Sequence, residues 1–498
     1  MCDICDVRPG TVKCSCGNLY CELHYAKHQA KQKRHYRMGG HIDKIWAWIS
    51  GATSALAGAS LREKGFERDE ASKWFGLHVT KKENDRFVRL IETTRFSSLV
   101  EESVREHGVR RQFPSIVSFI GETGAGKSTL IRSMISHSQS RQKTPSRRIP
   151  PHSSDNSDEG YQDRWDAPMP GAQQGTDALL PTTGEVNLYP DPSTFGTETP
   201  HFYADCEGML GGEPAAAQYQ QTWPKAAKRS YLLENKYQKK IDRITAVTTI
   251  YPRFMYIFSD VICMVTRNQK TWANSVVQLL EWSQVGSHNT VNQYALPALI
   301  VVLNGSTIEN EAWLDDENAA TNDFFRTIEN EIRENIILRK LAQKHGDKSM
   351  KEMLLRNFSS VHVHYVPLQG YKKLGGTNII VTQTDQLANR IRKDAERVQN
   401  YRKKTWTLYD ANQLQWVFDY AFKHLASGSE EPFDLNQFRQ QVSPPVTIDG
   451  YFAEFLGRSL YRSPQANFDA VGAVFGSSLF RRALKLDEQG EYSAYINR

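Results

Sequence analysis

The feature that most constrains this chain is a glycine-rich run at residues 121–129, with the sequence GETGAGKST. The run matches the pattern G-x-x-x-x-G-K-[ST] of a phosphate-binding loop (P-loop) at every fixed position. An apolar run at 115–120 precedes it and predicts a strand, while residues 130–135 predict the start of a helix. In that arrangement loop N–H groups approach phosphate oxygens closely, and the helix N-terminus favours negative charge. The run therefore predicts a phosphate-binding site.

Side chains of the loop predict how a nucleotide with Mg²⁺ would be bound. The Lys127 ammonium is expected to reach the β- and γ-phosphates, and the Ser128 hydroxyl is expected to bind Mg²⁺. We also assign Lys127 a catalytic role, because its charge would stabilise the transferred phosphoryl group. The nucleotide-binding residues predicted in this loop are Gly121, Gly124, Gly126, Lys127, Ser128 and Thr129.

A second motif, Asp205-Cys206-Glu207-Gly208, follows an apolar run that predicts another strand. A carboxylate at such a strand end holds Mg²⁺ in the manner of a Walker-B aspartate. We therefore assign Asp205 to Mg²⁺ and to the nucleotide, and Gly208 to the γ-phosphate through its backbone amide. Glu207 stands where a side chain can orient the attacking water, so it is a candidate catalytic residue.

Two threonines, Thr182 and Thr183, lie between these motifs, just before an extended run at 186–189. A threonine hydroxyl on a loop at this place can bind Mg²⁺ and sense the γ-phosphate. We choose Thr183 for this magnesium-binding and catalytic role, and Thr182 is the alternative.

Further apolar runs predict buried strands at 256–265, 298–303 and 361–368, with a helix around 276–282. Continuous apolar strands that alternate with helices indicate a mostly parallel sheet covered on both faces. We therefore predict an α/β fold for residues 114–380. A composition rich in Ser, Pro, Arg, Asp and Gln predicts a disordered insertion at 138–176.

The flanking regions are predicted to be helical. Residues 42–113 are interpreted as a helical lead-in, because Phe87, Leu90 and Ile91 follow i, i+3, i+4 spacing. Residues 381–498 are predicted to form a mainly helical C-terminal region. Within the central domain, a basic stretch at 225–243 is also compatible with a helix.

Residues 1–41 predict a small zinc module. Four pairs of candidate ligands occur there, namely Cys2 and Cys5, Cys14 and Cys16, Cys21 and His24, and His28 and His35. Eight such ligands suffice for two tetrahedral Zn²⁺ sites. A segment this short does not bury a core, so metal binding is expected to supply its folding energy. His41 is an alternative ligand for the second site.

Composition sets limits on partners and location. The net charge of +6 is small for 498 residues, and we do not expect nucleic acid as a partner. The uncharged stretch 45–61 is dominated by small residues, so membrane insertion is not expected either. The chain starts without an apolar signal region, which predicts a cytoplasmic location and leaves a nuclear one open.

The order of the motifs resembles the translation-factor-related class of P-loop GTPases, including its dynamin-like, guanylate-binding and septin-like branches. The resemblance covers residues 114–380 and implies a P-loop domain that binds GTP with Mg²⁺. The Cys/His module resembles a B-box-type zinc finger, in which the first and third ligand pairs share one zinc. That resemblance implies one site from Cys2, Cys5, Cys21 and His24, and a second from Cys14, Cys16, His28 and His35.

The base-reading motif departs from this class. Its members read guanine with Asn-Lys-x-Asp, whereas the matching strand here ends in Asn304-Gly305-Ser306-Thr307. We assign Asn304 to the nucleotide, although the lysine and the aspartate are missing. GTP is the expected nucleotide on resemblance, and ATP or no base preference are the alternatives.

Together these features predict an Mg²⁺-dependent guanine-nucleotide-binding protein, a slow GTPase that acts as a switch or assembly protein. The zinc module is expected to bind a protein partner, and the dynamin-like resemblance implies self-assembly. The rival hypotheses are a non-enzymatic scaffold or adaptor stabilised by nucleotide, and a P-loop protein that uses ATP.

Overall fold

A computed structural model describes most of residues 70–434 and short pieces elsewhere. The described residues are 70–82, 85–142, 167–168, 184–209, 223–233, 243–268, 272–286, 295–306, 310–316, 318–330, 334–368, 377–405, 407–429, 431 and 433–434, with 12–13, 19–20, 24, 27 and 472–473. The chain divides into two compact units, Met1–Leu435 and Asn436–Arg498.

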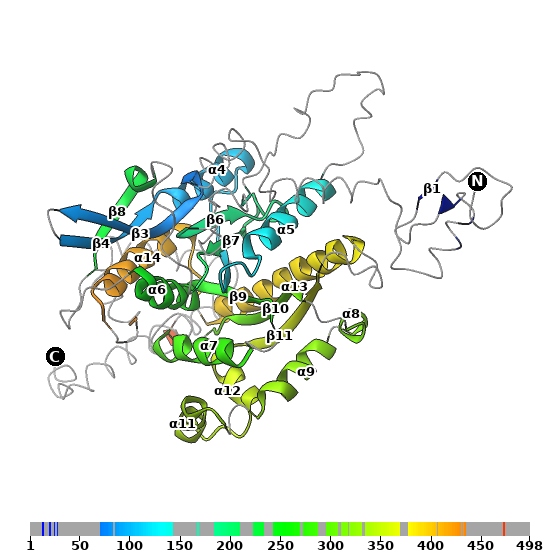
Figure 1. Cartoon of the computed structure of the whole chain (residues 1–498). Helices are drawn as coiled ribbons and strands as arrows, with labels where there is room; N and C mark the ends of the chain where they lie inside the picture. Colours follow the sequence, from blue (N-terminus) through cyan, green and yellow to red (C-terminus); the bar gives the residue numbers. More distant parts are fainter. Residues whose placement is uncertain are drawn as a thin grey trace, which may run out of the picture. The chain divides into compact units, whose positions relative to one another are not determined.

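The described part of the first unit is built on a nine-stranded sheet (Figure 1). Its strands are β3 (Lys73–Lys82), β4 (Asp85–Thr93), β5 (Ser115–Gly121), β6 (Val186–Pro190), β7 (His201–Cys206), β8 (Ala227–Leu232), β9 (Ser259–Thr266), β10 (Ala298–Ser306) and β11 (Ser360–Pro367). They lie in the order β11-β10-β9-β5-β7-β6-β3-β4-β8. The pairs from β11 to β7 are parallel, and the pairs from β7 to β8 are antiparallel. Only β6 and β4 therefore run against the others, which confirms the predicted mostly parallel α/β sheet.

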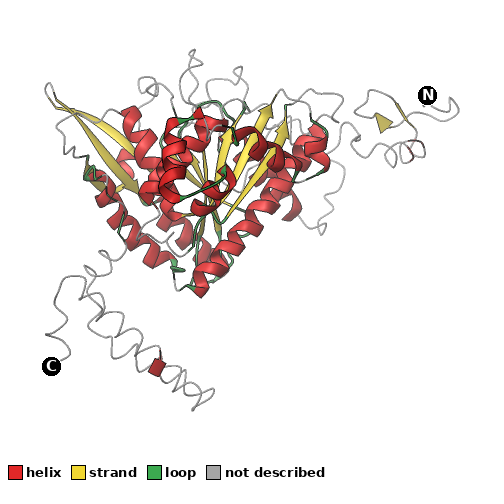
Figure 2. Ribbon diagram, turned by 90° about the horizontal axis from the view of Figure 1, so that it is seen from below, coloured by secondary structure: helices red, strands yellow, loops and turns green. Residues whose placement is uncertain are grey.

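Helices flank the strands (Figures 1 and 2). Their bounds are α4 (Arg95–His107), α5 (Lys127–Gln142), α6 (Arg243–Phe258), α7 (Trp272–Gly286), α8 (Ala312–Asp315), α9 (Ala319–Ile328), α11 (Ile336–His345), α12 (Met350–Asn357), α13 (Thr377–Lys404) and α14 (Ala411–Ala426), with a 3₁₀ turn η1 (Trp223–Ala226). Two-residue strands β1 (Val12–Lys13) and β2 (Leu19–Tyr20) pair antiparallel.

The core explains why these strands read as continuous apolar runs. Every residue of β5, β7 and β9 is buried, so both faces of the central sheet are covered. One core cluster joins β5, β9 and β10 to apolar side chains of α5 and α13, among them Ile131, Met134, Leu387 and Ile391. Helices α6 and α7 pack on each other, and α6 also contacts β5 and β9. The P-loop thus follows a central strand of a sheet whose middle strands are buried on both faces.

The prediction of a helical lead-in over 42–113 is wrong for its described part before residue 94. Residues 73–82 and 85–93 form the paired strands β3 and β4, and among the described residues of this region before Arg95 only 70–71 are helical. The apolar residues that fit helical spacing lie in β4. A short apolar run is compatible with both the helical and the strand period, and here pairing with the neighbouring strands determines the structure. Trp74 of β3 is fully buried between rings of α4, α6 and α14.

Four other predictions are corrected. The basic stretch 225–243 contains the edge strand β8, not a continuous helix. Helix α5 continues to Gln142, so the first residues assigned to the insertion at 138–176 are helical. Residues 256–258, predicted to begin a strand, end α6 instead. The predicted border at 380 also falls inside α13, which packs on the central sheet.

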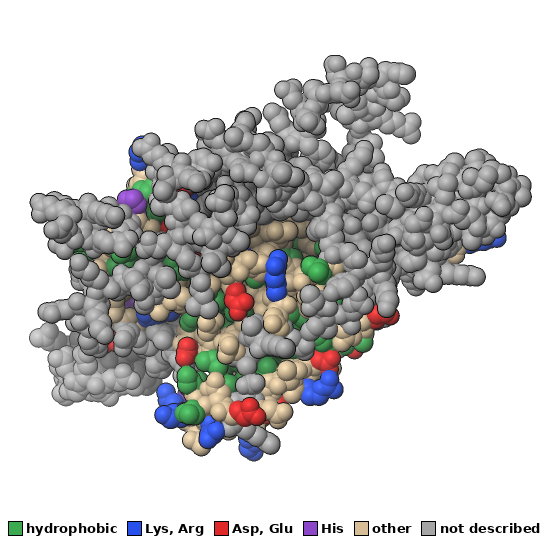
Figure 3. Space-filling model, viewed as in Figure 1, with side chains coloured by type: hydrophobic (Ala, Val, Ile, Leu, Met, Phe, Trp, Pro, Cys, Tyr) green, Lys and Arg blue, Asp and Glu red, His purple; other side chains and the backbone are tan. Residues whose placement is uncertain are grey.

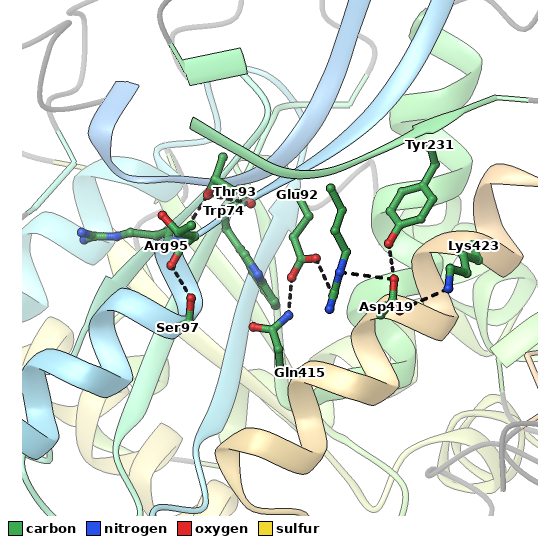
Figure 4. A network of polar contacts seen from close by, with 11 residues as sticks. Trp74, Glu92, Thr93, Arg95, Ser97, Tyr231, Gln415, Asp419 and Lys423 are labelled. Carbon is green, nitrogen blue, oxygen red and sulfur yellow. Dashed lines mark hydrogen bonds and ion pairs between the residues drawn. The ribbon is translucent and has the colours of Figure 1, made fainter. Parts of the chain in front are cut away.

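A polar network fixes α14 to the outer strands β4 and β8 (Figure 4). Glu92 of β4 lies opposite Arg229 of β8 and binds it at 3.1 Å, and Gln415 of α14 donates to the other Glu92 oxygen at 2.6 Å. Asp419 of α14 binds Arg229 at 3.4 Å and accepts from the Tyr231 hydroxyl. Helix α14 begins with a capping box at Asp410. It is therefore held at its start and along its length.

The stability of the fold is expected to depend on pH through Glu92. Burial raises the pKa of its carboxyl above the ordinary value of 4.5, although Gln415 and Arg229 oppose this effect. The native state therefore binds this proton more tightly than the unfolded state, and its stabilising contribution is lost as pH rises from 4.5 through the raised pKa. In urea denaturation, the stability of Glu92→Gln relative to the parent should increase as pH rises. The same substitution at exposed Glu101 is the control, and a pH-independent difference at Glu92 would contradict the expectation.

The described surface over α9, α11 and α12 carries acidic and basic side chains interspersed (Figure 3). A nucleic-acid-binding face would gather positive charge, so this part of the surface does not have that character. Among the described helices, none has the length and apolar character needed to cross a membrane. The stretch 45–61 lies outside the described residues.

Candidate functional site

The P-loop connects the carboxyl end of β5 to the first residue of α5. Lys127 is that first helical residue, and Ser128 and Thr129 follow in the first turn. The loop turns through Gly124 and Gly126, which have φ angles of 76° and 88°. Residues that carry a side chain rarely adopt such backbone angles, so glycine is needed at both positions. The predicted strand, loop and helix are confirmed.

Lys127 is folded back onto its own loop. Its ammonium group donates hydrogen bonds to the carbonyls of Gly121 and Glu122, each at 3.1 Å, and the residue is 5% exposed. Burial lowers the pKa of Lys127, and the nearby charges of Asp205 and Glu207 oppose that effect. An ammonium group that donates to neutral carbonyls can exchange them for anionic phosphate oxygens, which are stronger acceptors.

Asp205 lies next to this lysine. The parallel pairing of β5 with β7 sets it opposite Phe119, two residues before the loop begins, and it is fully buried. Its charge opposes the lowering of the Lys127 pKa by burial. The end of β7 and the first residue of α5 thus place the Asp205 carboxylate where its charge acts on the Lys127 ammonium.

The segment after Asp205 is paired directly with the P-loop. The Met209 N–H donates to the Gly121 carbonyl at 3.1 Å, and the Thr123 N–H donates to the Met209 carbonyl at 3.3 Å. Glu122 and Met209 form an isolated parallel bridge. Gly208 therefore lies against Thr123, where a Cβ on Gly208 would come within 2.5 Å of the Thr123 Cα.

Asn304 contacts the P-loop from β10, which is separated from β5 by β9. It lies near the end of β10, and its amide nitrogen donates to the Ala125 carbonyl at 2.9 Å. A Cβ on Gly126 would overlap this amide. The predicted base-reading asparagine is therefore within the same site as Lys127, and it braces the loop.

Glu207 is buried and its carboxylate is engaged. One oxygen accepts a hydrogen bond from the Glu185 N–H at 2.8 Å, and only 3% of the residue is exposed. A water-orienting role would require it to exchange this contact for a water. Its catalytic role stays a prediction.

Several predicted residues lie outside the described part of the chain. Thr182 and Thr183 are among them, and Gly184 is the first described residue after them. Of the zinc candidates only His24 is described, while Cys2, Cys5, Cys14, Cys16, Cys21, His28, His35 and the alternative His41 are not. Within the described residues, no group of three or more His, Cys, Asp or Glu side chains forms a metal-binding cluster.

Three residues of the site occupy no fixed position of a motif. Thr123 and Met209 join the two loops through backbone groups, which any residue supplies, so sequence alone could not single them out. Glu185 precedes the buried strand β6, and its side chain is 3% exposed. A charged residue at the entrance to an apolar run was the available signal for Glu185.

Gly208→Ala should disrupt the contact between the two loops. The added methyl would lie 2.5 Å from the Thr123 Cα and 2.8 Å from its nitrogen, so backbone must shift. We expect affinity for a slowly hydrolysed GTP analogue to fall by about tenfold or more, with a stability loss of about 1–3 kcal/mol. Calorimetric titration and thermal unfolding measure the two effects.

Gly346→Ala is the matched control for this substitution. Gly346 ends α11 with φ 73°, and a Cβ there meets nothing within 4 Å. It should cost about 1–2 kcal/mol of backbone strain and leave nucleotide affinity unchanged. Equal affinity of Gly208→Ala and the parent would contradict the role of the loop contact.

Comparisons with known proteins add little to this geometry. No protein-family model and no curated protein matches the sequence. Among solved structures, the crystal structure of a dimerization-deficient mutant of Toc33 from Arabidopsis thaliana is 11% identical to this chain. The alignment covers 59% of this chain and 93% of that chain, with a TM-score of 0.22. A likeness this low carries no conclusion about function.

Proposed function

We propose that this protein binds a guanine nucleoside triphosphate with Mg²⁺ and slowly hydrolyses it, acting as a nucleotide-controlled switch or assembly protein. The observation that carries the proposal is the convergence of Lys127, Asp205 and Asn304 on one P-loop, from strands and a helix far apart in sequence. Phosphate recognition by loop amides and a lysine is the chemistry that such a loop supports.

The residues of the chain would act mainly by positioning and charge. Lys127 would leave the Gly121 and Glu122 carbonyls and bind oxygens of the β- and γ-phosphates, and the Gly208 amide would donate to the γ-phosphate. Glu207, or Thr183 on the preceding loop, would orient the attacking water.

Mg²⁺ would be held by Ser128 and Asp205, and by Thr183 where that residue reaches the site. When bound, Mg²⁺ would neutralise part of the negative charge of the phosphates. The proposal is supported by the buried Asp205 carboxylate, whose charge acts on Lys127, because a carboxylate oxygen is a ligand that Mg²⁺ favours.

Preference for guanine would depend on Asn304 and on contacts that sequence did not reveal. One N–H of its amide donates to Ala125, which leaves the second N–H and the amide oxygen to act on a base. Use of ATP is the competing proposal, because the Lys and Asp of the usual guanine-reading motif are missing after Asn304.

The remaining regions would couple this site to partners. Rings connect the neighbourhood of β6 to α14 through Tyr251–Phe75 at 5.5 Å, Phe75–Phe254 at 4.8 Å and Phe254–Phe422 at 4.6 Å. This chain of contacts favours a role for α14 in reading out the nucleotide state. The N-terminal module would bind two Zn²⁺ and a protein partner. Self-assembly would depend on which nucleotide the P-loop domain has bound.

Phosphate release from GTP and ATP tests the proposal. The purified chain should release phosphate slowly from GTP, and EDTA or Asp205→Asn should abolish the release. Binding of GTP without Mg²⁺-dependent release would favour the non-enzymatic scaffold, and release from ATP alone would favour the ATP-using alternative.

A further inference from the structure

Glu185, the residue before β6, has a backbone conformation that residues with side chains rarely adopt. Its φ is 64°, and it is the only non-glycine residue among those described with a positive φ. It is also almost fully buried. Such a conformation persists only where surrounding contacts impose it, and it is often found at functional sites.

Two other elements hold the Glu185 carboxylate. Its Oε2 atom accepts a hydrogen bond from the Leu77 N–H of β3 at 2.7 Å and another from the Tyr251 hydroxyl of α6. Gly76 of β3 leaves the room for this side chain, because a Cβ on Gly76 would lie 2.5 Å from the same oxygen. Lys73 of β3 donates to the carbonyl of Gly184, the preceding residue. Strand β3 is therefore shaped to receive Glu185.

The backbone of Glu185 in turn holds the segment that follows β7. Its N–H donates to the Glu207 carboxylate at 2.8 Å, and its carbonyl accepts from the Glu207 N–H at 2.8 Å. The next residues, Gly208 and Met209, lie against the P-loop. Residues 207–209 are therefore fixed on one side by Glu185 and on the other by the loop.

We propose that Glu185 is a positioning residue, which holds residues 207–209 against the P-loop and thereby sets the preference of the site for nucleotides that carry a γ-phosphate. The inference rests on the proposed function. The backbone amides of the P-loop are assigned to the α- and β-phosphates and Lys127 to the β- and γ-phosphates, whereas the Gly208 amide is assigned to the γ-phosphate alone. Loosening Glu185 therefore weakens triphosphate binding and spares diphosphate binding.

Two substitutions at Glu185 separate geometry from charge. Glu185→Gln keeps an oxygen that can accept from both Leu77 and Tyr251, so it should retain the preference. Glu185→Ala removes both contacts and leaves the Leu77 N–H without its acceptor. Tyr251→Phe removes one donor and keeps the ring against Phe75, and it carries the test should Glu185→Ala fail to fold.

The measurement is the ratio of the dissociation constant for GDP to that for a slowly hydrolysed GTP analogue, by calorimetry of the full chain with Mg²⁺. We expect Glu185→Ala to lower this ratio by about tenfold, with GDP affinity within about threefold of the parent. Tyr251→Phe should lower the ratio by about threefold, and Glu185→Gln should leave it near the parent value.

The outcomes distinguish this inference from the proposed function. A parent that binds neither nucleotide overturns both. A parent that prefers the triphosphate, together with Glu185→Ala and Tyr251→Phe variants of unchanged ratio, overturns the positioning role alone. An equal weakening of GDP and GTP-analogue binding also overturns it, because a general loss of structure would produce that result. Equal loss of the ratio in Glu185→Gln and Glu185→Ala contradicts the hydrogen-bonding account.

Discussion

Lys127→Ala is expected to weaken binding of a slowly hydrolysed GTP analogue by on the order of 100-fold, or about 3 kcal/mol. The ammonium group is at the first residue of α5 and donates to two loop carbonyls, from which it can reach phosphate oxygens. Hydrogen bonds between charged partners are the strongest that a site of this kind offers. Calorimetric titration with Mg²⁺ measures the loss, and thermal unfolding checks that the variant is folded.

Lys340→Ala is the matched control for the lysine substitution. Lys340 is exposed on α11, so its removal should change neither nucleotide affinity nor stability measurably. A folded Lys127→Ala variant that binds as tightly as Lys340→Ala would show that nucleotide binds elsewhere or without this cation.

Arg402→Leu is expected to destabilise the fold by about 3–5 kcal/mol. Arg402 of α13 binds Asp260 of β9 at 2.7 Å, and the two side chains are 7% and 6% exposed. Asp260 also accepts from the Ser115 hydroxyl at the start of β5, at 2.7 Å. Without the arginine, the buried Asp260 carboxylate keeps the Ser115 hydroxyl as its hydrogen-bond donor among the described residues but loses its ion-pair partner. Urea denaturation measures the change.

A double variant separates loss of packing from the buried charge. Asp260→Asn combined with Arg402→Leu removes the charge and keeps an oxygen for Ser115, so it should be more stable than Arg402→Leu alone. The surface pair Arg326–Asp323 is the control, because Arg326 is 79% exposed and its loss should cost less than about 1 kcal/mol. Equal destabilisation by Arg402→Leu and Arg326→Leu would contradict the account.

The sequence was informative where chemistry and burial are local. The run at 115–129 specified β5, the loop and the start of α5, because a buried strand, glycines and a helix must follow one another there. Strands β7 and β10 were recognised from continuous apolar runs. By contrast, Phe87, Leu90 and Ile91 satisfied a helical period but lie in a strand, since pairing with β3 and β8 outweighs local spacing.

The tertiary contacts within the site could not be predicted from the sequence. Asn304 and Ala125 are 179 residues apart in the sequence. Their hydrogen bond forms because β5 and β10 are parallel, so that the P-loop and the end of β10 lie at the same end of the strands. The role of Glu185 depends on its contacts with Gly76 of β3 and Tyr251 of α6. No spacing along the chain indicates that these residues meet. The zinc module and Thr183 stay predictions, because their residues lie outside the described part.

The most direct test of the nucleotide-binding site is calorimetric titration of the full chain with slowly hydrolysed GTP and ATP analogues in the presence of Mg²⁺. The account predicts saturable binding of the GTP analogue, with ATP-analogue binding weaker by on the order of tenfold or more. Binding of neither analogue to the folded, metal-loaded chain would contradict it.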